Sequence, residues 1–447
     1  MIRQAKGLLQ NISFSKTRNL TFYNNTSFFF VPSYNFSETN NIPNPEKEQA
    51  LSKIKKQFID ADKYIRKRKN LDEAIKIYQE ILYSFNITQE AKAKQCLAAL
   101  IGIGNVLVLQ KRIDRALGYY LLALAFHPEN KYEFQRGILY KQIAECYFGI
   151  AEYENASEYF NKALALFKDS NNEDCTQIGQ IKLYIGRLYA KNGDFSQAAK
   201  NYKEAEKIFP KYIENDYFIL KAKTQLAKTY FWCKDKKSAK ISIKEAISLY
   251  DKAQGLKLQQ KIEITKEIIK ALKILQIREG IIEKYKTLVE LIYEDDPNSK
   301  NIPITLMNLG EQYIELYDRP KIKEIYLRAL EEAERLGLEE LKGKIYLNLG
   351  ICYWTLQDTN HAIDVINNSI EKNKEYYKYE NADVGKAYYY LGRIYFEEWD
   401  LDKSEKLFVT ALKILSENGS EDEHVYARCQ EYLYKVRDYL READNYK

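Results

Sequence analysis

The sequence predicts an all-α protein, a right-handed superhelical α-solenoid of about nine helix-turn-helix units closed by a C-terminal capping helix. Three observations lead to this fold class. The 447 residues include only 8 Pro and 18 Gly, so few positions interrupt helix formation. A small residue returns at regular spacing along the chain. Two segments far apart in the sequence also share one pattern of small and aromatic positions, which is the mark of a repeat architecture.

The repeated pattern is clearest in GNVLVLQKRIDRALGYYLLALAFHP, at 104–128, which returns as GRLYAKNGDFSQAAKNYKEAEKIFP at 186–210. Two antiparallel helices can approach closely where one offers Gly or Ala and the other fills the gap with a large ring. Lys191 to Asp194 supply the turn between the helices. The matching positions are Gly104 and Gly186, Leu107 and Tyr189, Ala116 and Ala198, Tyr120 and Tyr202, and Ala123 and Ala205. We expect Tyr189 to be one of the rings of the core.

The first small residue of the pattern sets the period. Eight steps separate Ala61 from Gly392, which lie 331 positions apart, so the mean period is about 41 residues. A degenerate unit around Ala271 and Ile274 fills the one gap in the series. The small residues are Ala61, Gly104, Ala144, Gly186, Ala227, Gly310, Gly350 and Gly392. Most are followed three positions later by a tyrosine: Tyr64, Tyr147, Tyr189, Tyr230, Tyr313, Tyr353 and Tyr395.

This pattern resembles the tetratricopeptide repeat, in a variant whose period exceeds the common value of about 34 residues. Longer periods occur in the kinesin-light-chain-like and polarity-adaptor branches of that superfamily. The resemblance covers about residues 50 to 442. It implies a non-catalytic scaffold for protein partners, with the first helix of each repeat lining a concave groove.

The composition divides the chain into four parts. We expect a basic segment at 1–37, a linker at 38–50, the solenoid at 51–442 and a short tail at 443–447. The first part carries four basic residues and no acid, whereas the whole chain has a net charge of +6, so the remainder carries only +2. This balance gives no case for nucleic-acid binding.

Residues 1–37 have the composition of a mitochondrial presequence, being basic, free of acids and rich in serine. Ile2, Leu8, Leu9 and Ile12 could form one face of a short amphipathic helix. We therefore expect mitochondrial delivery. A disordered basic arm on a cytoplasmic or ciliary protein is the alternative interpretation of the same segment.

The first helices of the repeats supply the candidate binding residues. Aromatic rings beside cations on an inner surface suit a partner segment that is acidic or amphipathic. The alternative is that the rings are packing residues and the cations a solvated face. The predicted groove residues are Arg187, Lys191, Lys221, Lys228, Phe231, Trp232, Trp354, Arg393 and Phe396.

Charge is polarised along the chain. Residues 182–244 include 15 basic and 6 acidic side chains, a net charge of +9, and residues 279–340 include 8 basic and 15 acidic ones, a net charge of −7. Such polarity can orient a bound partner.

Several function classes find no support. His127, His361 and His424 have no nucleophile or metal ligand at a catalytic spacing, so we expect no enzyme, no metal and no cofactor. No apolar run is long enough to span a membrane. A carboxylate clamp for chaperone tails is disfavoured, because Asn105 stands between Ile101 and Leu109 and Gln142 replaces a second Asn.

Three functions remain open from the sequence. The first is a structural or assembly subunit of a mitochondrial multiprotein complex. The second is a cytoplasmic or ciliary adaptor for cytoskeletal cargo. The third is an organellar RNA-associated helical-repeat protein, which the long period and the apolar inward positions disfavour.

Overall fold

A computed structural model of the protein describes residues 45–67, 70–83, 90–127, 133–169, 176–209, 216–278, 280–315, 318–417 and 423–445. These ranges contain α-helices and no strand. The helices are α2 (Pro45–Lys67), α3 (Leu71–Tyr83), α4 (Glu90–Leu109), α5 (Ile113–Ala125), α6 (Glu133–Gly149), α7 (Tyr153–Asp169), α8 (Thr176–Lys191), α9 (Phe195–Ile208), α10 (Asp216–Trp232), α11 (Lys236–Lys252), α12 (Leu258–Ile274), α13 (Ile281–Asp295), α14 (Asn301–Glu315), α15 (Arg319–Arg335), α16 (Glu339–Thr355), α17 (Thr359–Tyr377), α18 (Ala382–Glu397), α19 (Leu401–Glu417) and α20 (Glu423–Asn445).

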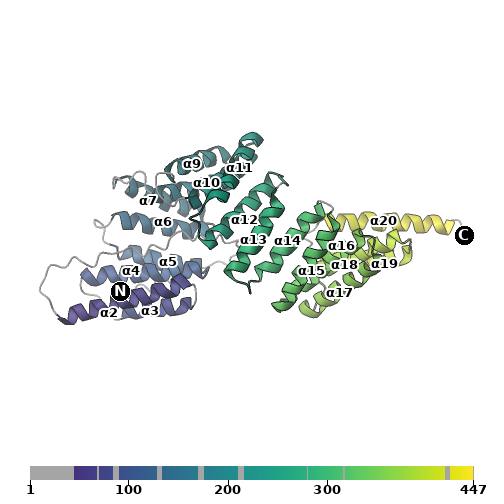
Figure 1. The fold of residues 1–447 in the computed structure, drawn as a ribbon, viewed down its shortest axis with the longest axis horizontal. Coiled ribbons are helices and arrows are strands. Elements are labelled where there is room, and N and C mark those ends of the chain that lie inside the picture. The colour runs from purple at the N-terminus through teal and green to yellow at the C-terminus, as the bar shows by residue number, and fades with distance from the viewer. Residues whose placement is uncertain are drawn as a thin grey trace. The chain divides into compact units, whose positions relative to one another are not determined.

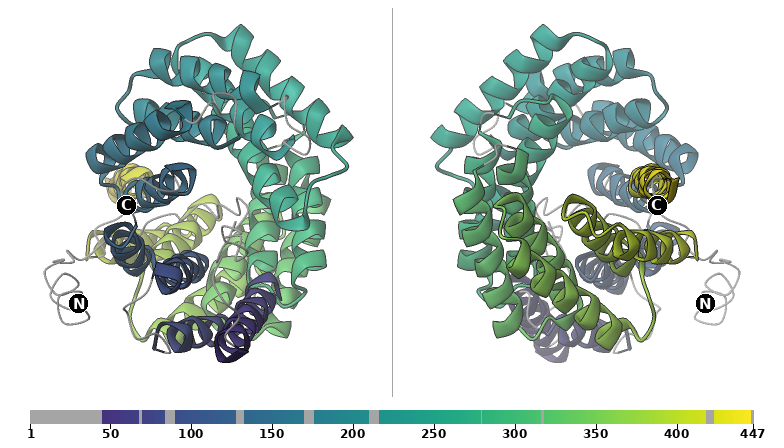
Figure 2. Two further views of the ribbon diagram at one scale, coloured as in Figure 1. Left: turned by 90° about the vertical axis from the view of Figure 1, so that its left-hand side faces the viewer. Right: turned by 90° about the vertical axis from the view of Figure 1, so that its right-hand side faces the viewer.

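The helices of these described ranges form nine consecutive pairs, from α2 with α3 to α18 with α19, followed by α20 (Figure 1). This confirms the predicted all-α class, the repeated helix pair and the C-terminal helix. The chain divides into two compact units, one ending at Glu263 and one beginning at Ile264, so α12 contributes to both. Within each unit the second helix of a pair packs against the first helix of the next, as α5 does on α6 and α17 on α18 (Figure 2). The sense of the superhelix stays a prediction.

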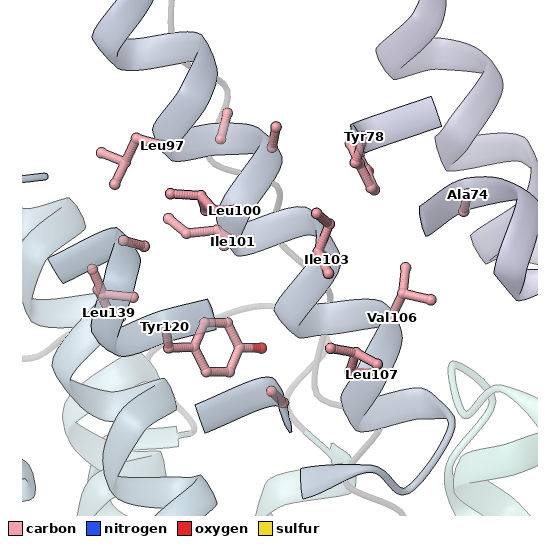
Figure 3. Close-up of a cluster of buried hydrophobic side chains, with 14 of the residues drawn as sticks. Ala74, Tyr78, Leu97, Leu100, Ile101, Ile103, Val106, Leu107, Tyr120 and Leu139 are labelled. Atoms are coloured by element: carbon pink, nitrogen blue, oxygen red, sulfur yellow. The ribbon is translucent and has the colours of Figure 1, made fainter. Parts of the chain in front are cut away.

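The small residues lie where the sequence pattern requires them. All eight, and Ala271 of the degenerate unit, are buried in the first helix of their pair. A Cβ atom added at Gly186 would lie 2.6 Å from Cε1 of Tyr202, and one added at Gly104 would lie 2.5 Å from Cε1 of Tyr120. Figure 3 shows the Tyr120 ring directed toward α4. The ring of the second helix therefore occupies the space that a side chain on the first would need.

Six of the described intrarepeat turns share one geometry. The residue seven positions after the small residue has a positive φ at Lys111, Ala151, Gly193, Lys234, Gln357 and Trp399. The next N–H then donates to the carbonyl five residues back, for example Asp194 to Tyr189 at 2.9 Å and Asp400 to Tyr395 at 2.9 Å. This bond closes the first helix in the manner of a Schellman motif. The Asp194 carboxylate caps the following helix by accepting from the N–H of Gln197 at 3.0 Å.

The structure separates two kinds of aromatic position. Tyr202 is 1% exposed, whereas Tyr189, which the sequence suggested as a core ring, is 38% exposed. The reason is geometric: Tyr202 projects from the second helix onto Gly186, and Tyr189 lies near the end of the first helix beside the turn. The fully buried rings of the core therefore come mainly from second helices, among them Phe160, Tyr326 and Phe408.

The helical region extends slightly beyond the predicted bounds. α2 begins at Pro45, inside the predicted linker, because proline is well tolerated in the first turn of a helix. At the other end α20 continues to Asn445, into the predicted tail. The proposed presequence at 1–37 lies outside the described residues, and the predicted division into four parts stays a prediction.

The ring positions give a test of the core. Tyr202→Ala should lower the free energy of unfolding by about 3 to 5 kcal/mol, because it removes a fully buried ring. Tyr189→Ala should cost less than about 1 kcal/mol, since that ring is largely outside the core. Guanidinium unfolding followed by circular dichroism measures both.

A second variant tests the contact itself. Gly186→Ala should destabilise the natural chain, because its Cβ meets the Tyr202 ring. Combined with Tyr202→Ala, the same change should become neutral or stabilising, since the space is then vacant and alanine favours helix by about 1 kcal/mol over glycine. Equal effects in both backgrounds would show that the ring does not set the helix spacing.

Candidate functional site

The first helices of the third to fifth repeats in the N-terminal unit carry a chain of buried polar side chains. Lys141 of α6 is 6% exposed and donates from Nζ to Oε1 of Gln177 and of Gln180, both at 2.6 Å, on α8. It also lies 3.8 Å from the carboxylate of Glu145. The neighbouring first helices are thus joined through polar contacts rather than by an apolar core alone.

Glu145 stands between cations of three helices. Burial raises the pKa of its carboxyl above the ordinary value, and the positive charges of Lys141, Lys221 and Arg187 act in the opposite direction. The Arg187 guanidinium lies over the ring of Phe148 at 4.4 Å from its centroid. Arg187, a predicted groove cation, is therefore held by an aromatic ring and faces a carboxylate of its own chain.

Lys221 of α10 is also engaged within the chain. Its Nζ lies 3.0 Å from Oε1 of Glu263 and 5.0 Å from the centre of the Tyr217 ring, and the Tyr217 hydroxyl donates to Oε2 of the same glutamate at 2.7 Å. The two charged side chains of the pair are only 15% and 10% exposed. Lys221 is a predicted groove cation for an acidic partner, yet its charge is largely buried and already has a partner 42 residues along the chain.

An exposed aromatic and cationic surface lies beside this network. Trp232, the last residue of α10, is 54% exposed. Its ring stacks on Phe195, the first residue of α9, with centroids 6.1 Å apart, and meets the edge of Phe231 at 5.5 Å. Exposed lysines occupy the adjoining turns. We call this surface the Trp232 patch, and its members are Lys191, Phe195, Phe231, Trp232, Lys234, Lys236 and Lys237.

The predicted groove residues of the C-terminal unit pack against one another. The Arg393 guanidinium lies 4.8 Å from the centre of the Trp354 ring and 4.3 Å from that of Tyr432. Nε1 of Trp354 donates to Glu397 at 2.9 Å. Phe396 lies against Tyr432, at 5.6 Å, and Tyr439, both of α20. Arg393 and Phe396 therefore contact the C-terminal helix, as the packing interpretation predicts for rings, and are half-buried.

The structure thus distinguishes among the predicted groove residues. Lys191 and Trp232 are exposed, and the others are half-buried: Arg187, Lys221, Lys228, Phe231, Trp354, Arg393 and Phe396. Sequence reasoning missed Phe195, whose place at the start of a second helix gave no signal of its contact with Trp232. It also missed Glu145 and Glu263, the partners of the predicted cations.

Two segments match family models described as the tetratricopeptide repeat, at residues 135–211 and 343–376. The chain carries tetratricopeptide repeats. The matched segments fall in different units and each includes a small residue with its second helix, which agrees with the helix pairs of the structure. Tetratricopeptide repeats indicate a protein-interaction scaffold.

Several solved structures are similar to this one at low sequence identity. A STAND protein with a tetratricopeptide-repeat sensor from Pyrococcus horikoshii is 17% identical, with a TM-score of 0.50, and the match covers 80% of this chain and 50% of that one. The present chain thus spans about half the length of that protein. RapI is 20% identical over 64% of this chain and 99% of its own, with a TM-score of 0.45. A Rap protein complexed with competence and sporulation factor is 13% identical, covers 88% of this chain and 99% of its own, and has a TM-score of 0.43.

A search of curated proteins finds no match. Among the described residues, no helix is long and apolar enough to cross a membrane, and no group of three or more His, Cys, Asp or Glu side chains is arranged to hold a metal ion. Asn105, the candidate clamp residue of the tetratricopeptide repeats, is 1% exposed and accepts hydrogen bonds from Tyr120 at 2.6 Å and Gln142 at 3.0 Å.

The Lys221 pair leads to a test by charge reversal. Lys221→Glu should lower the free energy of unfolding by about 3 kcal/mol, because it places a second carboxylate beside the buried Glu263. Lys191→Glu, at an exposed position, should change it by less than about 0.5 kcal/mol. Denaturant unfolding of both variants provides the measurement. Equal stabilities would mean that the Lys221 pair is solvated.

Proposed function

We propose that this protein is a non-catalytic scaffold whose Trp232 patch binds an acidic or amphipathic segment of a protein partner. The observation that carries the proposal is the exposure of Trp232 on a stacked pair of rings, with Lys191, Lys234 and Lys236 exposed around it. Tryptophan is enriched among the residues that dominate binding energy at interfaces. Cations at the rim favour an acidic partner by speeding its approach and aligning it.

The buried network supports the patch. Arg187 and Lys221 are held by contacts with their own chain. The first joins the first helix of the fourth repeat, α8, to that of the third, α6, and the second joins the first helix of the fifth repeat, α10, to Glu263 of α12. The stacked pair of Phe195 and Trp232 spans these two repeats. A surface whose rings are already ordered loses little conformational freedom when it binds.

We further propose that the protein is a structural or assembly subunit of a mitochondrial multiprotein complex. The support is the basic, acid-free and serine-rich composition of residues 1–37. An interaction scaffold without a catalytic centre suits a role in holding other subunits. The two proposals are separable, because binding at the Trp232 patch does not depend on the compartment.

The partner proposal is tested with the full chain. After gentle native purification identifies a co-purifying protein, its affinity for variants is measured by calorimetry. Trp232→Ala should weaken binding by about 2 kcal/mol, which is the loss expected for an interface anchor. The paired change Lys234→Glu and Lys237→Glu should weaken binding mainly at low salt, because the effect is one of screened charge.

A matched control is Tyr434→Ala, which removes a ring that is 70% exposed on α20, far along the sequence from the patch. It should leave the affinity unchanged. All three variants should unfold at the natural midpoint, since the altered groups are exposed. Natural affinity in a folded Trp232→Ala variant would move the binding surface elsewhere.

Delivery has its own test. A fluorescent reporter fused after residue 37 should accumulate in mitochondria, because the segment combines positive charge with an amphipathic start. Replacing Arg3, Lys6, Lys16 and Arg18 with Gln in the same fusion should abolish delivery. A diffuse cytosolic signal from the unaltered fusion would contradict the mitochondrial proposal and leave the scaffold proposal standing.

A further inference from the structure

Trp399 is the bulkiest residue among the six equivalent positions of the described intrarepeat turns. It has a φ of 62° and is 69% exposed. The equivalent turn positions carry small or flexible side chains: Lys111, Ala151, Gly193, Lys234 and Gln357. A bulky residue is rare in the left-handed region, where Cβ crowds the backbone. Burial of the ring does not offset this backbone cost, because most of the Trp399 ring remains in water.

The Trp399 ring ends a row of aromatic side chains between α18 and α20. It lies 5.6 Å from Tyr439, which stacks on Phe396 at 6.1 Å, and Phe396 in turn meets the edge of Tyr432. Tyr439 is itself 39% exposed. The row thus passes from a covered end at Tyr432 to an open end at Trp399.

At the covered end the rings hold a cation of the chain itself. There the Arg393 guanidinium lies over both Trp354 and Tyr432, and its Nη2 is 3.3 Å from the carboxylate of Glu397. A cation above aromatic faces, with a carboxylate beside it, gains both ring attraction and charge pairing.

The open end repeats this arrangement without a cation over the Trp399 ring. Glu398 and Asp402, which flank Trp399 in the sequence, are exposed, and Asp400 adds a third negative charge while it accepts from the N–H of Lys403. Among the described residues, no cation of the chain lies over the ring of Trp399; the nearby Lys403 covers Tyr395 instead.

We propose that this surface is a second docking site, which binds a protein segment through an arginine or lysine side chain. We call it the Trp399 patch, and its members are Phe396, Glu398, Trp399, Asp402 and Tyr439. The bound cation takes the place over Trp399 that Arg393 takes over Trp354, with Glu398 and Asp402 pairing its charge. The carboxylates repel nucleic acid and anionic lipid, so a cationic peptide segment is the occupant that fits.

The site is independent of the Trp232 patch, which lies in the other unit and has the opposite charge. The whole chain carries a net charge of +6, so its overall charge repels a cationic peptide. Binding of such a peptide therefore reports local recognition at an acidic surface.

The experiment uses the full chain and two fluorescein-labelled synthetic peptides of the same length, one with arginine alternating with alanine and one with neutral citrulline in place of arginine. Fluorescence anisotropy should show saturable binding of the arginine peptide, and binding of the citrulline peptide about tenfold weaker or absent. Equal binding of the two peptides would overturn the proposal, because the cation would then contribute nothing.

The decisive variants alter one side chain. Trp399→Gly removes the ring and relieves the backbone, so the chain should stay folded with an unchanged or higher unfolding midpoint. It should bind the arginine peptide about tenfold more weakly. Trp399→Phe should retain part of the affinity, because it keeps an aromatic face, and Glu398→Gln should weaken binding at low salt.

Tyr434→Ala is the matched control, since it removes another exposed ring of the same unit. It should bind the arginine peptide as the natural chain does. Natural affinity in Trp399→Gly, or an equal loss in Tyr434→Ala, would overturn the proposal, because the ring of Trp399 would then have no specific part in recognition.

Discussion

In four of the described repeats a large ring from the second helix lies against the glycine at the repeated small position of the first and sets the distance between the two helices. Gly186 with Tyr202 and Gly392 with Phe408 are examples from the two units. Once this distance is set, the next repeat can pack on the pair, and one face of each first helix is left for polar contacts. The buried network around Lys141 and the exposed rings at the turns both follow from this spacing.

Most of the fold could be predicted because its determinants lie close together in sequence. Gly104 and Tyr120 stand within one helix pair, so their pattern is visible in a single segment and recurs. Even the degenerate unit at Ala271 could be placed from the period, and it is a first helix in the structure. The turn at Gly193 was equally visible, since its backbone conformation favours glycine.

The binding surfaces were harder to predict, because exposure depends on contacts between repeats. Lys221 resembles a solvated cation until Glu263 is placed beside it, and Phe396 resembles a groove residue until α20 covers it. Tyr189 matched the pattern and yet lies beside a turn, where a ring is not enclosed. The exposed ring of Trp399 could not be predicted from the sequence, since the residue type at a turn usually reflects the backbone conformation and not a role of the side chain.

The two exposed tryptophans suggest that the middle of a repeat serves helix packing, whereas the end of its first helix is available for binding. Trp232 and Trp399 both lie where a first helix ends, which is outside the contact between the small residue and its ring. Side chains there can change without disturbing helix packing. This explains how one architecture carries a cationic surface in one unit and an acidic surface in the other.

The left-handed turns have a consequence for how such a chain can evolve. Five of the six equivalent positions hold residues other than glycine, although each carries a backbone cost of roughly 1 kcal/mol that glycine would avoid. Substitution by glycine at these five turns could therefore increase the stability of the protein at several places along the chain. During evolution, a glycine substitution at one of these turns could stabilise the chain. Such substitutions would offset destabilising changes acquired while the surfaces adapt to new partners.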